Sequence, residues 1–177
     1  MSPKPNDPLL AAGKILTVLL MIVIGLVTVF LLALVPVVLF SNAEFAVELT
    51  EAAGADATRV KFAAAVLLAL AATVAAFSFH FFQLLGRIIK SVANGDPFTF
   101  ENSKRMTRMG WIALGFQIAS FPIGALAVYL SQYVPQDNLT VDFEFTLTGV
   151  LLAVVLFILA RVFNHGASMR EDLEGTV

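Results

Sequence analysis

The chain has no cysteine, which excludes disulfides, thiolate metal sites and cysteine nucleophiles. Charge is also scarce: Asp, Glu, Lys and Arg make up 14% of the 177 residues, against roughly 25% in soluble proteins. A net charge of −2 gives no general basic field for direct nucleic-acid binding. The two histidines, His80 and His165, are far apart in sequence, and no His-Glu-x-x-His motif or set of paired intramembrane carboxylates is present. We therefore expect no enzyme, no bound metal and no cofactor.

Apolar residues dominate instead, at 59% of the chain with a mean hydropathy of +0.88. Four stretches carry no formal charge: 15–43, 62–86, 109–136 and 145–160. Three of them exceed the about 20 residues that a helix needs to cross about 30 Å of hydrocarbon, and flanking residues must help the fourth to span. The sequence predicts an all-α integral membrane four-helix bundle made of two hairpins. The predicted segments are a tail over 1–13, helices near 14–40, 62–86, 108–133 and 144–164, and a C-terminal tail over 165–177.

The positions of Lys and Arg predict how the helices are oriented. Of the 11 such residues, only Arg59 and Lys61 fall on one side of the predicted membrane, and the rest fall on the other. This asymmetry predicts that both termini and the middle connection are cytoplasmic. A cleaved signal peptide is the alternative for the first run, because residues 41–43 are typical of a cleavage site. That run is about twice the usual apolar length of a signal peptide, which favours a retained helix.

Small residues recur at helical spacing in the second and third runs. Residues of this size let two backbones approach closely in lipid, where van der Waals contact drives helix association. The alternative is that alanine fills lipid-facing positions. The candidate packing residues are Ala69, Ala72, Ala76, Gly115, Ala119 and Gly124.

Polar residues inside the third run offer one candidate polar pocket, at Gln117 and Ser120. Discontinuous helices in transporters place such groups near the bilayer midplane. The alternative is an ordinary proline kink at Pro122, whose freed carbonyl is satisfied by a neighbouring side chain. The sequence favours the kink.

The connection between the second and third runs has strong turn chemistry. Gly95 can end a helix and Thr99 can cap the next one. Phe98 lies between them, and Lys104, Arg105 and Arg108 follow at the start of the third helix. We expect these four residues to contact anionic lipid headgroups or a cytoplasmic partner protein.

Two stretches here resemble a known family. They are LLGRIIKSVANGDPFT at residues 84–99 and ARVFNHGASMRED at residues 160–172. They are similar to the family catalogued as "domain of unknown function 2975", and the likeness covers essentially the whole chain. The resemblance implies a small bacterial inner-membrane protein, in a family often encoded beside a small helix-turn-helix regulator. No catalytic residues are established for that family.

The combined expectation is a non-enzymatic, multi-pass inner-membrane protein. We expect it to be an accessory or signalling partner of a cytoplasmic protein, such as a neighbouring helix-turn-helix regulator. The alternative is a small-solute or ion conduit. Membrane lipids are expected contacts, and the sequence carries no signal for an oligomeric state.

Overall fold

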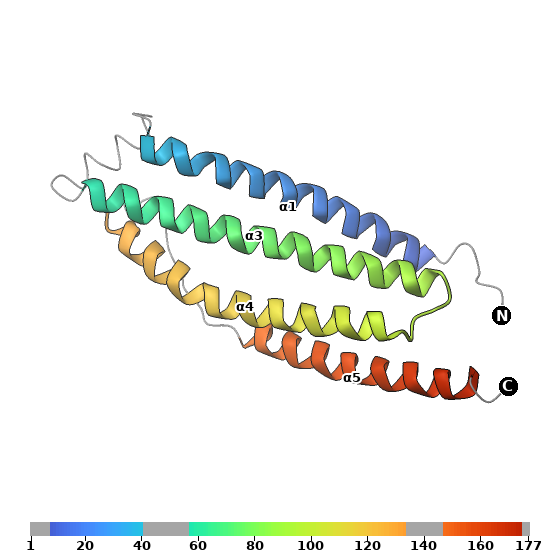
Figure 1. The fold of residues 1–177 in the computed structure, drawn as a ribbon. Coiled ribbons are helices and arrows are strands. Elements are labelled where there is room, and N and C mark those ends of the chain that lie inside the picture. Colours follow the sequence, from blue (N-terminus) through green and yellow to red (C-terminus); the bar gives the residue numbers. More distant parts are fainter. Residues whose placement is uncertain (1–7, 41–56, 134–146, 175–177) are drawn as a thin grey trace. The chain divides into compact units, whose positions relative to one another are not determined.

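The computed structural model describes residues 8–40, 57–133 and 147–174, and these residues form four helices and no strand. The helices are α1 (Pro8–Phe40), α3 (Ala57–Ala93), α4 (Phe100–Ser131) and α5 (Thr148–Glu174) (Figure 1). Each is long and apolar enough to cross a membrane. The predicted all-helical class and the four apolar helices are therefore confirmed, and they indicate a membrane protein.

The helices are longer than the predicted spans. The 37 residues of α3 measure about 55 Å at the usual rise per residue, against about 30 Å of hydrocarbon. α1 begins at Pro8 rather than near 14, and α5 continues to Glu174 rather than ending near 164. Charged residues end an apolar run, but Lys, Arg and Glu are good helix formers, so the helix itself continues. Residues 1–7 of the tail predicted over 1–13, and residues 144–146 of the predicted fourth helix, lie outside the described residues.

Two compact units divide the chain. Unit 1 comprises Met1–Ile24, Phe77–Phe116 and Leu147–Val177, and unit 2 comprises Gly25–Ala76 and Gln117–Thr146. Residues of α3, α4 and α5 share the core of unit 1: Leu84, Ile88, Met106, Met109, Ala113, Ala153, Leu156 and Ala160. Residues of α1, α3 and α4 share the core of unit 2: Val38, Val60, Ala63, Ala64 and Leu130.

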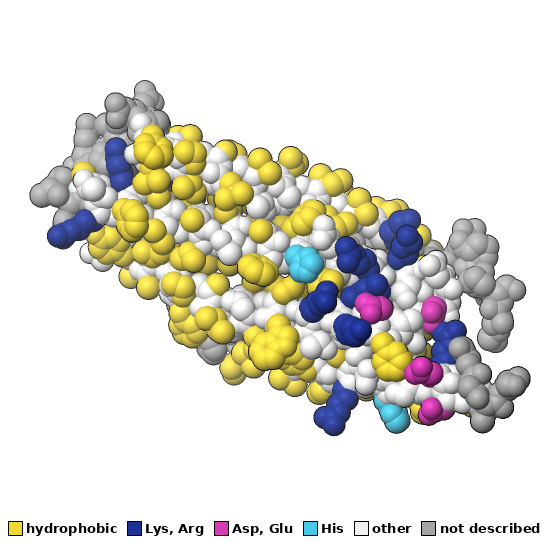
Figure 2. Space-filling model, in the orientation of Figure 1, with side chains coloured by type: hydrophobic (Ala, Val, Ile, Leu, Met, Phe, Trp, Pro, Cys, Tyr) yellow, Lys and Arg dark blue, Asp and Glu magenta, His cyan; other side chains and the backbone are white. Residues whose placement is uncertain are grey.

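Large apolar side chains cover the outside of both units. None of the most apolar 18-residue window of α1 is buried. Phe30 in unit 2 is 63% exposed, and Leu151 in unit 1 is 64% exposed. Figure 2 shows this apolar surface as broad yellow areas. In water such a surface would drive association, whereas lipid solvates it, so these side chains are suited to contact with acyl chains.

The structure gives mixed environments to the small residues that the sequence singled out. Ala72 is 1% exposed and Gly124 is buried, whereas Ala69 and Ala76 are exposed and Ala119 is half-buried. Contact between the two helices through these positions stays a prediction.

Two glycines of α4 in unit 1 have different surroundings: one lies on an open surface and the other lies close to α5. Gly115 is exposed, and a Cβ built there would meet nothing within 4 Å. The close approach lies instead at Gly110, where a Cβ would lie 2.8 Å from the ring of Phe157 on α5.

Candidate functional site

The α3–α4 connection (Asn94–Thr99) is a closed turn in unit 1. Gly95 has a φ of 80°, the left-handed conformation that favours glycine, and its amide donates to the Val92 carbonyl at 3.0 Å. The Asp96 amide donates to the Ser91 carbonyl at 3.1 Å. These bonds satisfy the last carbonyls of α3, as glycine-ended helices commonly do. The prediction that Gly95 ends the helix is confirmed.

The start of α4 is capped as the sequence predicted. The Thr99 hydroxyl oxygen accepts a hydrogen bond from the Asn102 amide at 3.2 Å, which confirms the N-cap. Glu101 lies in the first turn, where a negative charge favours the positive end of the helix dipole.

Asn102 is the centre of the network beneath this turn, and its side chain is fully buried. Its Nδ2 donates to the Ser91 hydroxyl at 2.9 Å and to the Pro97 carbonyl at 2.8 Å. Its Oδ1 accepts from the Arg105 guanidinium at 2.7 Å. One side chain thus joins the end of α3, the connection and the first turns of α4, and all its polar atoms have partners.

Four contacts fasten the connection and the start of α4 to α5. The buried Ser103 hydroxyl donates to the Ala160 carbonyl at 2.8 Å. Asp96 forms an ion pair with Arg170. The Phe98 ring packs on Phe163 with centroids 5.1 Å apart, and a Cβ at Gly166 would lie 2.8 Å from that same ring. Only a residue without a side chain fits beneath Phe98 at this point on α5.

A cavity of about 760 Å³ lies beside Phe98. Apart from Phe98, its lining residues belong to α5. They run from Ile158, near the end of the fourth apolar run, to Met169, beyond that run. Its lining combines apolar side chains with Arg161 and His165 at an exposed surface. The residues that line it are Phe98, Ile158, Arg161, Val162, Asn164, His165, Gly166, Ser168 and Met169.

The four residues predicted to contact a partner or lipid differ in their exposure and in their contacts. Lys104 and Arg108 are exposed, and Lys104 pairs with Glu101 at 3.2 Å. Arg105 is half-buried and engaged by Asn102, and Phe98 is 44% exposed but packs on α5. In Figure 2, Lys and Arg side chains gather in unit 1 where α3 ends and α4 begins. Lys104 and Arg108 are therefore presented at the surface, whereas Arg105 and Phe98 also hold the turn together.

The two residues of the candidate polar pocket, Gln117 and Ser120, lie in unit 2 and are hydrogen-bonded within α4. Ser120 donates its hydroxyl to the Gln117 carbonyl at 2.7 Å, and both residues are half-buried. Neither residue lines either of the two cavities described in this chain. A conduit at this position stays a prediction from the sequence.

Within residues 8–40, 57–133 and 147–174, no group of three or more His, Cys, Asp or Glu is placed to hold a metal ion. His80 on α3 and His165 on α5 are both exposed.

Sequence reasoning missed the buried polar centre of this site. Asn102 occupies the third position after the Thr99 cap, within a first turn where capping interactions concentrate, so its spacing was an available signal. Ser103, Asp96 and Arg170 gave no comparable signal, because their partners lie on α5 or in the connection and are distant in sequence.

Comparison with known proteins adds one match. The model of a family described as "Protein of unknown function (DUF2975)" matches residues 42–177. The matched residues include α3, α4 and α5, and α1 lies outside them, so the match is narrower than the expected likeness over essentially the whole chain. No curated protein and no solved structure matches the chain.

Proposed function

The chain belongs to the DUF2975 family, and we propose that it acts without catalysis, as a membrane-embedded docking partner for a cytoplasmic protein. The partner class we propose is a helix-turn-helix regulator of the kind encoded beside family members. We place the chain in the bacterial inner membrane, with both termini and the α3–α4 connection on the cytoplasmic side, because nearly all of its basic residues fall on that side.

One observation carries the proposal: the cavity beside Phe98 lies at the end of unit 1 where a hydrogen bond, an ion pair and ring packing join α5 to the α3–α4 connection and the start of α4. The Ser103–Ala160 bond and the packing of Phe98 on Gly166 hold its walls in place. A preformed apolar cavity can receive an anchoring side chain at a small entropic cost, because little has to be ordered on binding.

The position of the cavity favours a protein partner in water over the acyl chains of the bilayer. Arg161 follows directly after the fourth apolar run, and α5 continues from it to Glu174. Arg161 and His165 line the cavity, and the exposed Lys104 and Arg108 belong to the same unit. A partner segment with an apolar anchor and acidic neighbours would complement this surface.

The test measures binding of a purified regulator to the full chain in nanodiscs. Met169 lines the cavity and is 52% exposed, so M169D places a charge at its edge without disturbing a buried core. We expect M169D to weaken regulator binding about tenfold or more, which corresponds to about 1.4 kcal/mol. Leu173 lies one turn further along α5, is 72% exposed and does not line the cavity, so L173D is the matched control.

Two results would overturn the proposal. One is the absence of saturable binding to the full chain. The other is an equal loss of affinity in M169D and L173D, because a non-specific charge effect would then account for both. A K104E/R108E variant tests the charge component separately, and its effect should diminish as salt is raised.

A further inference from the structure

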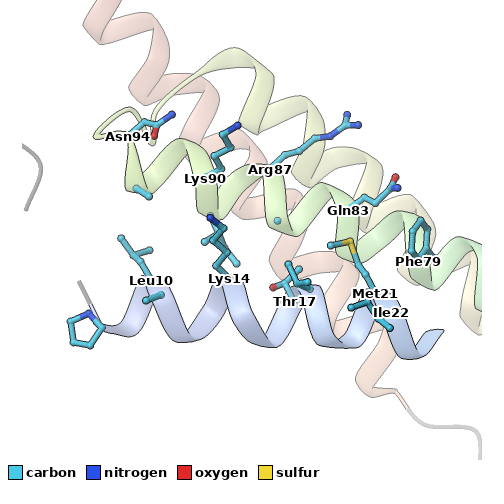
Figure 3. A pocket seen from close by; sticks show the side chains of 16 residues that line it. Leu10, Lys14, Thr17, Met21, Ile22, Phe79, Gln83, Arg87, Lys90 and Asn94 are labelled. Atoms are coloured by element: carbon cyan, nitrogen blue, oxygen red, sulfur yellow. The ribbon is translucent and has the colours of Figure 1, made fainter. Parts of the chain in front are cut away.

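A second cavity lies within unit 1, between the first turns of α1 and the last turns of α3, and has a volume of about 890 Å³ (Figure 3). The two helices are in van der Waals contact beside it. A Cβ at Gly86 would lie 3.5 Å from the Thr17 methyl carbon, and one at Gly13 would lie 3.7 Å from Ile89. We call this cavity the basic cleft. α1 supplies one wall and lies outside the matched family residues, so the family match does not by itself imply the cleft.

One end of the basic cleft is strongly cationic. Lys14 from α1 and Arg87 and Lys90 from α3 line it. In Figure 3, Lys14 extends from α1 toward α3, whereas Arg87 and Lys90 extend from α3 on the side away from α1. All three side chains are exposed, and none has a hydrogen-bond or ion-pair partner among the described residues. The described lining contains no Asp or Glu. Three cations without counter-charges favour an anionic group between them.

The other end of the basic cleft is apolar. Val18, Met21 and Ile22 from α1 and Phe79 from α3 line it. Figure 3 shows Met21 and Ile22 on the same side of the cleft as one another, near Phe79, with Gln83 between Phe79 and Arg87 along α3. On α1 the lining positions Lys14, Val18 and Met21 follow helical spacing, so the charged and apolar ends lie on one continuous face.

The lining of the cleft changes from cationic to apolar at the level where two uncharged runs of the sequence begin or end. The first apolar run begins directly after Lys14, and the second ends directly before Arg87. In a bilayer whose hydrocarbon begins where these uncharged runs begin and end, the cations lie at headgroup level, and Val18, Met21 and Phe79 lie at acyl-chain level. A free phosphate would use only the cationic end, whereas a phospholipid matches both ends.

We propose that the basic cleft is a binding site for an anionic phospholipid. Its phosphate lies at the cationic end beside Lys14, where the long exposed side chains of Arg87 and Lys90 turn toward it on binding, and an acyl chain lies along Val18 and Met21. Basic pockets between membrane helices recognise anionic headgroups by this combination of charge and depth. The site is separate from the cavity beside Phe98 and does not depend on the proposed docking function.

The test uses the full chain in an uncharged detergent and native mass spectrometry with phosphatidylglycerol or phosphatidylcholine of equal chain length. We expect phosphatidylglycerol to bind about tenfold more tightly than phosphatidylcholine. The triple variant K14Q/R87Q/K90Q should abolish that preference. The control K104Q/R108Q/R161Q removes the same number of exposed charges from unit 1 outside the cleft. Because Lys104 and Arg108 are themselves expected to contact anionic headgroups, we expect this control to weaken phosphatidylglycerol binding by at most about threefold and to keep the preference for phosphatidylglycerol.

A second variant tests the apolar end while every charge is kept. V18W fills part of the cleft from a 42% exposed position, and we expect it to weaken phosphatidylglycerol binding about fivefold. Inorganic phosphate in large excess should not displace the lipid.

Four outcomes would overturn the proposal. Equal losses in the two triple variants would indicate diffuse surface charge, and equal affinity for the two lipids would indicate no headgroup recognition. Displacement by phosphate, or no effect of V18W, would indicate an anion site without an acyl chain. A mass corresponding to two chains in place of a lipid adduct would make a second copy the occupant.

Discussion

Replacing Asn102 with alanine should be among the most destabilising polar substitutions in unit 1. The side chain is fully buried and makes three hydrogen bonds, to Ser91, Pro97 and Arg105. The variant removes all three at once and leaves the Pro97 carbonyl and the Arg105 guanidinium without this partner. Because these groups join the end of α3 to the start of α4, the variant weakens the turn between the two helices.

The expected magnitude follows from the bond types. Two neutral bonds contribute about 1 kcal/mol each, and the bond from the charged Arg105 contributes about 1.5–3 kcal/mol. Ser91 and Arg105 are only half-buried, so water can replace part of what is lost. We therefore expect N102A to lower the free energy of unfolding by about 2–4 kcal/mol. N94A, at an exposed asparagine in the same connection, should change it by less than about 0.5 kcal/mol.

The assay is a reversible denaturation in mixed detergent followed by tryptophan fluorescence. Trp111 is the single tryptophan, and its ring packs edge-on against Phe157 with centroids 5.5 Å apart, so its emission reports contact between α4 and α5 in unit 1. A double-mutant cycle with R105M should give a coupling energy of about 0.5–3 kcal/mol. If N102A and N94A unfold at the same denaturant concentration, the Asn102 network does not stabilise the turn and this reasoning fails.

Three further predictions can be checked on the same protein. G110L should destabilise unit 1 by about 1–3 kcal/mol through overpacking against Phe157, whereas G115L should have little effect because its side chain meets open space; equal effects would contradict the described packing of α4. A72L should destabilise the protein more than A69L because Ala72 is buried and Ala69 is exposed, and thermal unfolding in detergent measures the difference. The predicted topology requires reporter fusions to read out, in, out and in, and a periplasmic reading at the second position would reverse the orientation. The fusion positions are Gly54, Gly95, Asp137 and Val177.

The helical architecture could be predicted because the bilayer restricts what an apolar chain can form. A run such as 62–86 has to be a helix in lipid, since no water is present to satisfy its backbone groups. The turn could also be predicted, because Gly95 and Thr99 act through bonds to residues within a few positions of themselves. The start of α1 and the end of α5 differ from the predicted spans, because hydropathy marks where lipid contact ends and a helix can continue beyond that point.

The contacts between helices could not be predicted from spacing alone. Gly110 and Gly115 are equally small, and only the rotation of α4 about its axis brings Gly110 against Phe157. The same holds for Ser103 and Ala160, whose bond depends on two helices that the sequence does not place side by side. The sequence identifies Lys14, Arg87 and Lys90 only as markers of membrane orientation, because the cleft that they share depends on the pairing of α1 with α3.

The closed bonding of the α3–α4 connection also constrains how the gene can vary. Inserting or deleting one codon between Pro97 and Asn102 would alter the spacing of the Asn102 side-chain amide from both Ser91 and Pro97, and would displace Phe98 from Gly166. Such a change disrupts several bonds at once, whereas a substitution at an exposed site such as Asn94 disrupts none of them. Length variation between related genes should therefore be excluded from this segment, and peptide tags inserted there should abolish folding.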